Sequence, residues 1–155
     1  MNLMILENCY LVDANSHEPR PDNTILIEEN RIKEVSDKPI QMSDAQRNDL
    51  KGKTPMPGLI DAHCHVILSD QNIRNVDSST QTLVTAMAGK LKGEMLDRGF
   101  TTVRDAAGAD WGIQAAQEQG LIRGPRIWID GRALSQDESL GPGSRITTLR
   151  SYPLA

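Results

Sequence analysis

The sequence predicts a mixed α/β chain, in which a small N-terminal β region precedes the first strand–helix units of a larger fold. Two observations carry this prediction. Short apolar runs separated by turn formers fill residues 1–56, and strand-like and helix-like segments then alternate. Such alternation is typical of parallel strands joined by crossover helices. We therefore expect a β region at 1–56, strand–helix units at 57–136 and an irregular tail at 137–155.

The β region contains several brief strand candidates. Residues 3–6 and 10–12 are short apolar runs, whereas residues 15–23 hold two prolines and several turn formers and are expected to form a loop. Residues 24–35 read as a hairpin turning at Glu29-Asn30, because Asn tolerates the left-handed backbone conformation. The polar residues 43–51 are expected to form a connection.

The later segments alternate in character. Residues 56–66, 100–104 and 126–129 are strand candidates. A helix is expected from Ser78 or Ser79 to Arg98, and a second, capped by Asp110, over residues 111–119. The apolar stripe of the first helix should consist of Val84, Met87, Leu91 and Met95, while Lys90 and Lys92 are expected on its solvated face.

The composition narrows the possible partners. A net charge of −4 with scattered basic residues argues against nucleic acid and anionic membranes. No apolar run approaches the roughly 18 residues that span a bilayer, and the N-terminus lacks a basic signal region. Two cysteines, Cys9 and Cys64, do not indicate a disulfide framework. The expected location is cytoplasmic.

The most informative segment is PGLIDAHCHV at residues 57–66. If it is a strand, its side chains alternate, so His63 and His65 share a face with Leu59 and Asp61, and Cys64 points the other way. Two imidazoles at this spacing can converge on one divalent ion, and neutral imidazole suits zinc and similar ions. The alternative is two histidines in a polar loop, because a lone His-X-His pair is a weak signal.

The context of the pair strengthens the metal interpretation. The string PGLIDAHCH at 57–65 resembles the metal-binding signature of the amidohydrolase superfamily, and RGFTTVRD at 98–105 resembles its second-strand motif. The family's N-terminal hairpin resembles residues 24–35, and the lead-in to its first strand resembles residues 50–53. Its third-strand region, in the branch related to imidazolonepropionase and Xaa-Pro or Xaa-Arg dipeptidases, resembles residues 124–135. The resemblance implies a TIM-like (β/α)8 barrel and metal-activated water acting on amide, cyclic amide or dipeptide substrates. It implies that His63 and His65 bind the metal.

Four other residues were weighed as site candidates. Cys64 is expected to be a buried, inert thiol. Asp61 either orients a metal ligand or makes an ordinary structural hydrogen bond. Asp105 is interpreted as a loop cap or a partner of Arg104 rather than as a functional residue. His17 is expected in a solvated loop.

The length leaves three functions open. A complete barrel takes about 250 residues, and no histidine follows His65. We therefore expect an incomplete barrel that is inactive alone. A truncated or frameshifted gene would produce such a chain, and so would an unusual branch of the family. The chain is then the N-terminal part of a hydrolase, a non-catalytic remnant with at most weak metal binding, or a binding module made of the β region. The substrate and the oligomeric state are not predicted.

Overall fold

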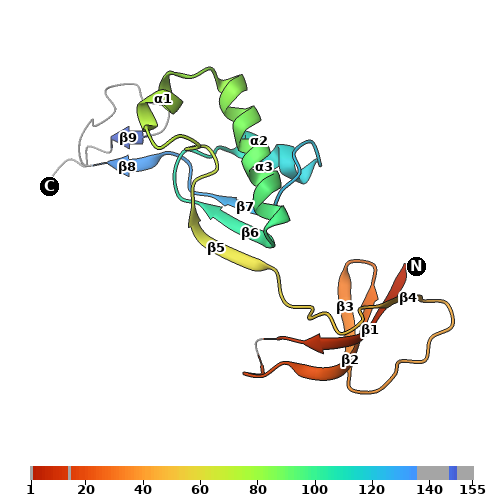
Figure 1. Ribbon diagram of the computed structural model, residues 1–155. Helices are drawn as coiled ribbons and strands as arrows, with labels where there is room; N and C mark the ends of the chain where they lie inside the picture. The colour runs from red at the N-terminus through yellow and green to blue at the C-terminus, as the bar shows by residue number, and fades with distance from the viewer. Residues whose placement is uncertain (1, 14, 136–146, 150–155) are drawn as a thin grey trace, which may run out of the picture. The chain divides into compact units, whose positions relative to one another are not determined.

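The computed structural model describes residues 2–13, 15–135 and 147–149. The chain divides into two compact units, Met1–Pro57 and Gly58–Ala155 (Figure 1). Within the described ranges no helix is long and apolar enough to cross a membrane. The elements in chain order are β1 Leu3–Leu11, β2 Arg20–Glu28, β3 Arg31–Ser36, β4 Gln46–Asp49, β5 Leu59–Cys64, α1 Ile73–Ser78, α2 Gln81–Asp97, β6 Phe100–Asp105, α3 Trp111–Glu118, β7 Arg126–Ile129, β8 Ala133–Ser135 and β9 Thr147–Leu149.

The first unit is a four-stranded sheet in the order β3-β2-β1-β4. Neighbouring residues of a strand point to opposite faces, so Ile25 and Leu26 of β2 serve two separate cores. Leu26 packs with Ile5 and Ile40, and Ile25 packs with Cys9 and Leu11. Apolar packing on both faces therefore holds this small sheet together.

Four details of this unit differ from the sequence predictions. The two short runs at 3–6 and 10–12 belong to one strand, β1. The predicted connection at 43–51 contains β4, which pairs with β1 in parallel. The predicted loop at 15–23 ends early, because β2 begins at Arg20. The hairpin of β2 and β3 is present, but Glu29 rather than Asn30 takes the left-handed conformation, with φ of 55°.

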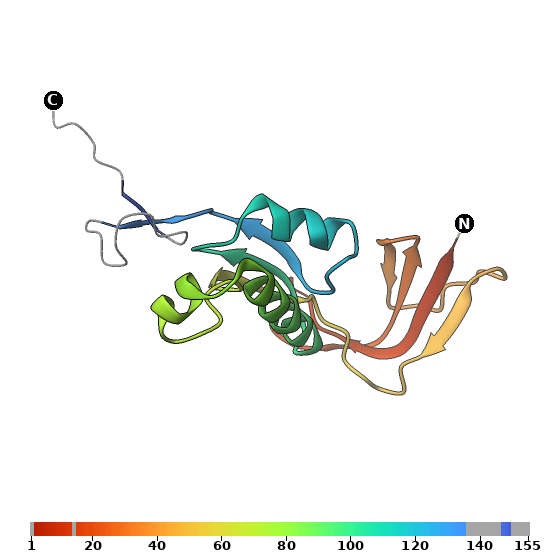
Figure 2. The same cartoon turned by 90° about the horizontal axis from the view of Figure 1, so that it is seen from above.

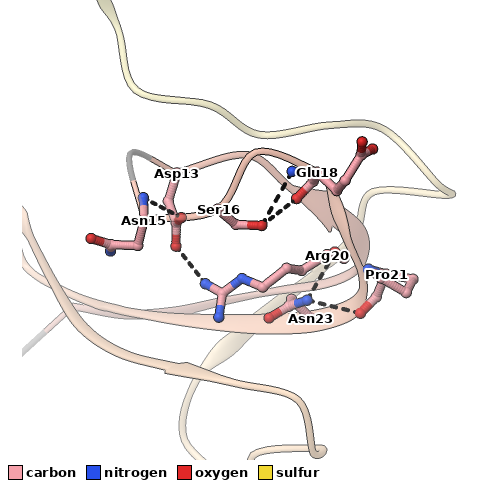
Figure 3. Close-up of polar contacts among 7 residues, drawn as sticks. All are labelled: Asp13, Asn15, Ser16, Glu18, Arg20, Pro21 and Asn23. Atoms are coloured by element: carbon pink, nitrogen blue, oxygen red, sulfur yellow. Dashed lines mark hydrogen bonds and ion pairs between the residues drawn. The ribbon is translucent and has the colours of Figure 1, made fainter.

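The connection between β1 and β2 is held by its own polar side chains (Figure 3). Asp13 pairs with Arg20 and accepts a hydrogen bond from the Asn15 backbone N–H at 2.9 Å. The side-chain amide of Asn23 donates to the carbonyl oxygens of Arg20 and Pro21, at 2.9 and 2.8 Å. His17 lies exposed in this connection, as the sequence predicts for a loop residue.

The second unit contains a parallel sheet in the order β5-β6-β7. Helix α2 contacts β6 and α3 contacts β7 (Figure 2). The apolar core lies between helices and sheet and is formed by Val66, Ala88, Met95, Val103, Ala109, Ile113 and Ile127. On the opposite face of the sheet, Ile60 and Trp128 are 72% and 62% exposed. The helices thus cover one face of the sheet, and among the described residues the other face is open.

The helices depart from prediction in two ways. Residues 73–78 form a short helix, α1, that the sequence analysis did not predict, and α2 begins after Thr80 rather than after Ser78 or Ser79. The buried positions of α2 are Ala88, Lys92 and Met95, whereas Met87 is 38% exposed. The predicted stripe is therefore wrong in part, and the prediction that Lys92 faces solvent is wrong.

The last described elements are β8 and β9, which pair in parallel. Because β9 falls within residues 137–155, the prediction that this whole tail is irregular is wrong at residues 147–149. Residues 136–146 and 150–155, which make up the rest of the predicted tail, lie outside the described part of the chain.

Candidate metal site

The two histidines lie at the C-terminal end of β5. The strand ends at Cys64, so His63 is its penultimate residue and His65 follows immediately. The pairing with β6 is irregular between Asp61 and Cys64, where β5 carries one residue more than β6. Such a bulge re-aims a side chain at the end of a strand. Strict alternation of side chains from Asp61 to Cys64, on which the predicted faces of the strand depend, therefore does not hold.

A local hydrogen bond supports the bulge. The Asp61 carboxylate accepts the His63 backbone N–H, two residues along the chain, at 3.0 Å. This pattern is typical of aspartate in a turn. The structure shows the structural hydrogen bond predicted as one role of Asp61, made through Oδ1. The other role, orientation of a metal ligand, stays a prediction.

The two imidazole rings are close together. Their centroids are 5.2 Å apart and their planes meet at 87°. Rings that share a tetrahedral zinc ion, with each nitrogen about 2.0–2.1 Å from the metal, have centroids about 5 Å apart. His65 is half-buried, and its Nδ1 atom is buried without a hydrogen-bond partner in the described part of the chain. A buried acceptor or donor left unpaired is costly, so the residues present fit a divalent metal.

Asp105 supports the segment behind the histidines. It ends β6, is fully buried, and accepts three backbone N–H groups, those of Val66 at 2.6 Å, Ala107 at 3.0 Å and Ala109 at 3.2 Å. Burial raises the pKa of the Asp105 carboxyl, and the three hydrogen bonds oppose that rise. Arg104, the other partner considered, instead pairs with Asp130 at 3.7 Å. Asp105 is therefore a loop cap, as predicted. Its additional hydrogen bond with the Val66 N–H was not predicted from the sequence.

Cys64 lies between the two histidines in sequence but packs against the apolar core. Burial, with the nearby Asp105 and Asp61 carboxylates, raises the pKa of the thiol to about 11. The thiolate is the reactive form of cysteine, so this side chain is a poor nucleophile and a poor metal ligand at neutral pH. Cys9 and Cys64 are both free.

Lys92 is the buried charge that the sequence analysis missed. Its side chain is fully buried, its Nζ atom has no hydrogen-bond partner among the described residues, and burial lowers the pKa of its amine to about 8. The signal was its spacing, four residues after Ala88 and three before Met95, which is that of one helix face.

The described residues do not complete a metal site by themselves. They contain no group of three histidine, cysteine, aspartate or glutamate side chains placed to hold one ion. A cavity of about 540 Å³ lies beside the N-termini of α2 and α3, and neither His63 nor His65 is among the described residues that line it. The histidine pair therefore supplies two ligands and no enclosed substrate cavity.

Comparison with known proteins places this arrangement in context. The chain superimposes on a solved amidohydrolase with a TM-score of 0.82 and 46% identity, over 86% of this chain and 32% of that one. A prolidase solved with N-methylphosphonate-L-proline matches with a TM-score of 0.82 and 39% identity, over 86% of this chain and 33% of that one. The ochratoxinase of Aspergillus niger is 35% identical over 89 residues, which are 56% of this chain and 18% of the relative. No protein-family model matches the chain.

Each of these matches covers only part of the relative. The chain spans about a third of the solved relatives and less than a fifth of the ochratoxinase. It contains a strand ending in His-X-His, a parallel β5-β6-β7 sheet with α2 and α3 packed on it, and a separate small β unit before them. In sequence and in fold, the chain is therefore a counterpart of the N-terminal region of the amidohydrolase superfamily.

Proposed function

We propose that this chain is the N-terminal, metal-binding part of a metal-dependent hydrolase of C–N bonds, organised as the first units of a TIM-like barrel. The single observation that carries the proposal is the geometry of His63 and His65. Their rings are 5.2 Å apart, and the Nδ1 atom of His65 is buried and unpaired within the described residues. His63 and His65 would hold a divalent ion, with zinc as the first candidate.

Two aspartates support the backbone next to the two histidines. Asp61 holds the backbone of His63, and Asp105 holds the backbone directly after His65. A divalent ion bound here would activate water and polarise the carbonyl group of a C–N substrate. Cys64 stays protonated against the core and takes no part in that chemistry.

The substrate class follows from the relatives. A prolidase, solved with a phosphonate derivative of L-proline, is among the proteins with a TM-score of 0.82. We therefore propose dipeptides and related small amides as substrates of the full-length enzyme. The remaining ligands, the general base and the substrate cavity would be supplied by segments that this part of the fold does not contain, because a catalytic zinc site takes three protein ligands and an open position.

Calorimetric titration with zinc tests the metal site. We expect weak, saturable binding by the chain, because it supplies two imidazoles, and loss of that binding in the His63→Ala/His65→Ala variant. The matched control is His17→Ala, which removes the other histidine of the chain from an exposed loop. Binding that survives the double substitution, or that is lost equally in the control, would show that the pair is not the site.

A second function has one observation in its favour. The described residues supply two candidate ligands and no third, which suits a non-catalytic polypeptide with weak metal affinity. The two functions differ in what happens when the missing segments are present. Turnover by a chain extended with the remaining strands of a homologue favours the hydrolase, and zinc binding without turnover by that chain favours the non-catalytic protein.

A further inference from the structure

His65 is less supported by its own strand than His63 is. It follows the last residue of β5, and the pairing of that strand with β6 ends at Cys64 and Asp105. The Nδ1 atom of its ring has no partner among the described residues. The orientation of the ring therefore depends on how the backbone on either side of it is held.

The backbone after His65 is held by one carboxylate. Asp105 Oδ2 accepts the Val66 N–H at 2.6 Å, across 39 positions of sequence. Its other oxygen, Oδ1, accepts the N–H groups of Ala107 and Ala109 from the loop after β6. Hydrogen bonds to an ionised, buried acceptor are among the stronger ones in proteins, so this carboxylate fixes two segments to each other.

Backbone hydrogen bonds extend the same junction. The Ala106 N–H donates to the Cys64 carbonyl oxygen at 3.0 Å, and the Asp130 N–H donates to the Asp105 carbonyl oxygen at 3.1 Å. The ends of β5, β6 and β7 are thereby joined at the level of Asp105. Asp105 itself has no exposed surface, so water does not compete for its oxygens.

We propose that Asp105 is a positioning residue for the metal site, holding the backbone at Val66 so that the His65 ring keeps its orientation beside His63. The inference rests on the proposed metal binding by the pair. A metal site with two ligand residues binds more weakly when one of the side chains becomes ordered only as the metal binds. The loss of conformational entropy then reduces the binding free energy. Asp105 removes that cost through the backbone without touching the ion.

The chain offers a matched control in Asp110. It follows the same strand and its Oδ1 also accepts two backbone N–H groups, those of Gly112 at 2.9 Å and Ile113 at 3.3 Å, but these belong to α3. Asp105→Asn and Asp110→Asn each remove one charge and leave one carbonyl acceptor. Asp105 is buried and accepts through both oxygens, whereas Asp110 is exposed and accepts through Oδ1 alone. A difference between the two variants therefore reports the buried contacts of Asp105 with Val66, Ala107 and Ala109, and not the loss of a negative charge alone.

The experiment measures zinc affinity by calorimetry and the visible spectrum of the Co²⁺-loaded chain, which reports ligand geometry. We expect Asp105→Asn to weaken zinc binding about tenfold, as supporting partners of metal ligands commonly do, and to shift the Co²⁺ bands. Asp110→Asn should change the affinity by less than about twofold and leave the bands in place. Equal effects of the two variants, or an unshifted spectrum in Asp105→Asn, would overturn the inference.

Two further measurements separate the possible failures. If the His63→Ala/His65→Ala variant binds zinc as tightly as the original chain, it is the proposed function that fails. If Asp105→Asn does not fold, amide hydrogen exchange in the unsubstituted, zinc-loaded chain decides the question. Protection of the Val66 amide comparable to that of Val103 in β6 supports the positioning role, and exchange of Val66 at the rate of an open loop contradicts it.

Discussion

At the scale of single residues, the buried amine of Lys92 lowers the stability of the fold. It is fully buried with no hydrogen-bond partner among the described residues, and burial lowers its pKa from 10.5 to about 8. The folded state therefore binds this proton less tightly than the unfolded state. The destabilisation is fully present below about pH 8 and disappears as the pH rises towards 10.5, and its full size is about 3 kcal/mol.

We expect Lys92→Met to stabilise the chain at pH 7, by up to about 3 kcal/mol in urea unfolding, because Met fills a similar volume without a charge. The stability of the original chain should rise by about 1 kcal/mol between pH 7 and 9 relative to the variant. Above pH 9 the raised pKa of Cys64 acts in the opposite direction, so the comparison is best made below that pH.

The control for this prediction is Lys90→Met. The Lys90 side chain is 81% exposed and lies 3.6 Å from Glu94 in an ion pair one helical turn away. Removal of an exposed pair changes stability by about 0.5 kcal/mol at most. A Lys90→Met variant that gains as much stability as Lys92→Met would show that hydrophobicity, and not burial of the amine, explains the effect.

Single residues also show what the sequence could and could not predict. The histidine pair was found because its motif carries the chemistry locally, within three residues. Asp105 was predicted as a loop cap, and its bonds to Ala107 and Ala109 are of that local kind. Its bond to Val66 joins segments 39 residues apart, and no local pattern encodes such a contact. Lys92 was predicted to face solvent because of its charge, although its spacing from Ala88 and Met95 places it on the buried face of the helix.

At the scale of secondary-structure elements, glycines decide how closely the segments approach. A Cβ atom at Gly124 would lie 2.6 Å from Lys92 Cβ and 3.2 Å from the Lys92 backbone carbon. Neither atom can move away without shifting α2. We expect Gly124→Ala to destabilise the chain by about 1–3 kcal/mol, the usual cost of overpacking, measured as a lowered urea midpoint.

Gly89, on the same helix, is the contrasting position. A Cβ atom there would meet Ile122 at 3.6 Å, an ordinary contact. Gly89→Ala should therefore stabilise α2 by about 1 kcal/mol through helix propensity. The two substitutions should therefore shift the urea midpoint in opposite directions. If both shift it in the same direction, the close approach of residues 124–125 to α2 does not explain the effect of Gly124→Ala.

The elements that sequence patterns predicted well are those whose signals are local. The β2–β3 hairpin, α3 with its Asp110 cap, β6 and β7 lie within a few residues of their predicted bounds. Strand β4 was missed because it is polar and exists only through pairing with β1, more than thirty positions earlier. Helix α1 was missed because its six residues contain one buried apolar side chain, Val76.

At the scale of the whole molecule, the open face of the β5-β6-β7 sheet sets what the chain can do. Ile60 and Trp128 are largely exposed on it, and the solved relatives are about three times as long. A fold that closes this face would shield the histidines from bulk water and supply further groups around them. This is the physical basis for our proposal that catalysis belongs to a full-length homologue and metal binding to the present residues.

We therefore expect the 155-residue chain to show no amidohydrolase turnover. Catalysis needs a metal with an open coordination position, a base for its water and a shaped cavity for the substrate. The described residues supply two candidate ligands, and neither His63 nor His65 lines their cavities of about 540 and 620 Å³. Losing one such feature commonly costs orders of magnitude in rate. The test is a panel of dipeptides and cyclic amides with added zinc, manganese or cobalt.

The His63→Ala variant decides what any observed activity means. Activity of equal size in the original chain and in the variant would come from a contaminant and would leave the prediction standing. Activity that copurifies with the chain and disappears in the variant would contradict it. A second copy of the chain that completes the site would explain such a result, because the two imidazoles of the described residues leave a zinc ion short of the three protein ligands of a catalytic centre. At high dilution, where most of the chain is monomeric, the rate would then rise with the square of protein concentration, which a concentration series measures directly.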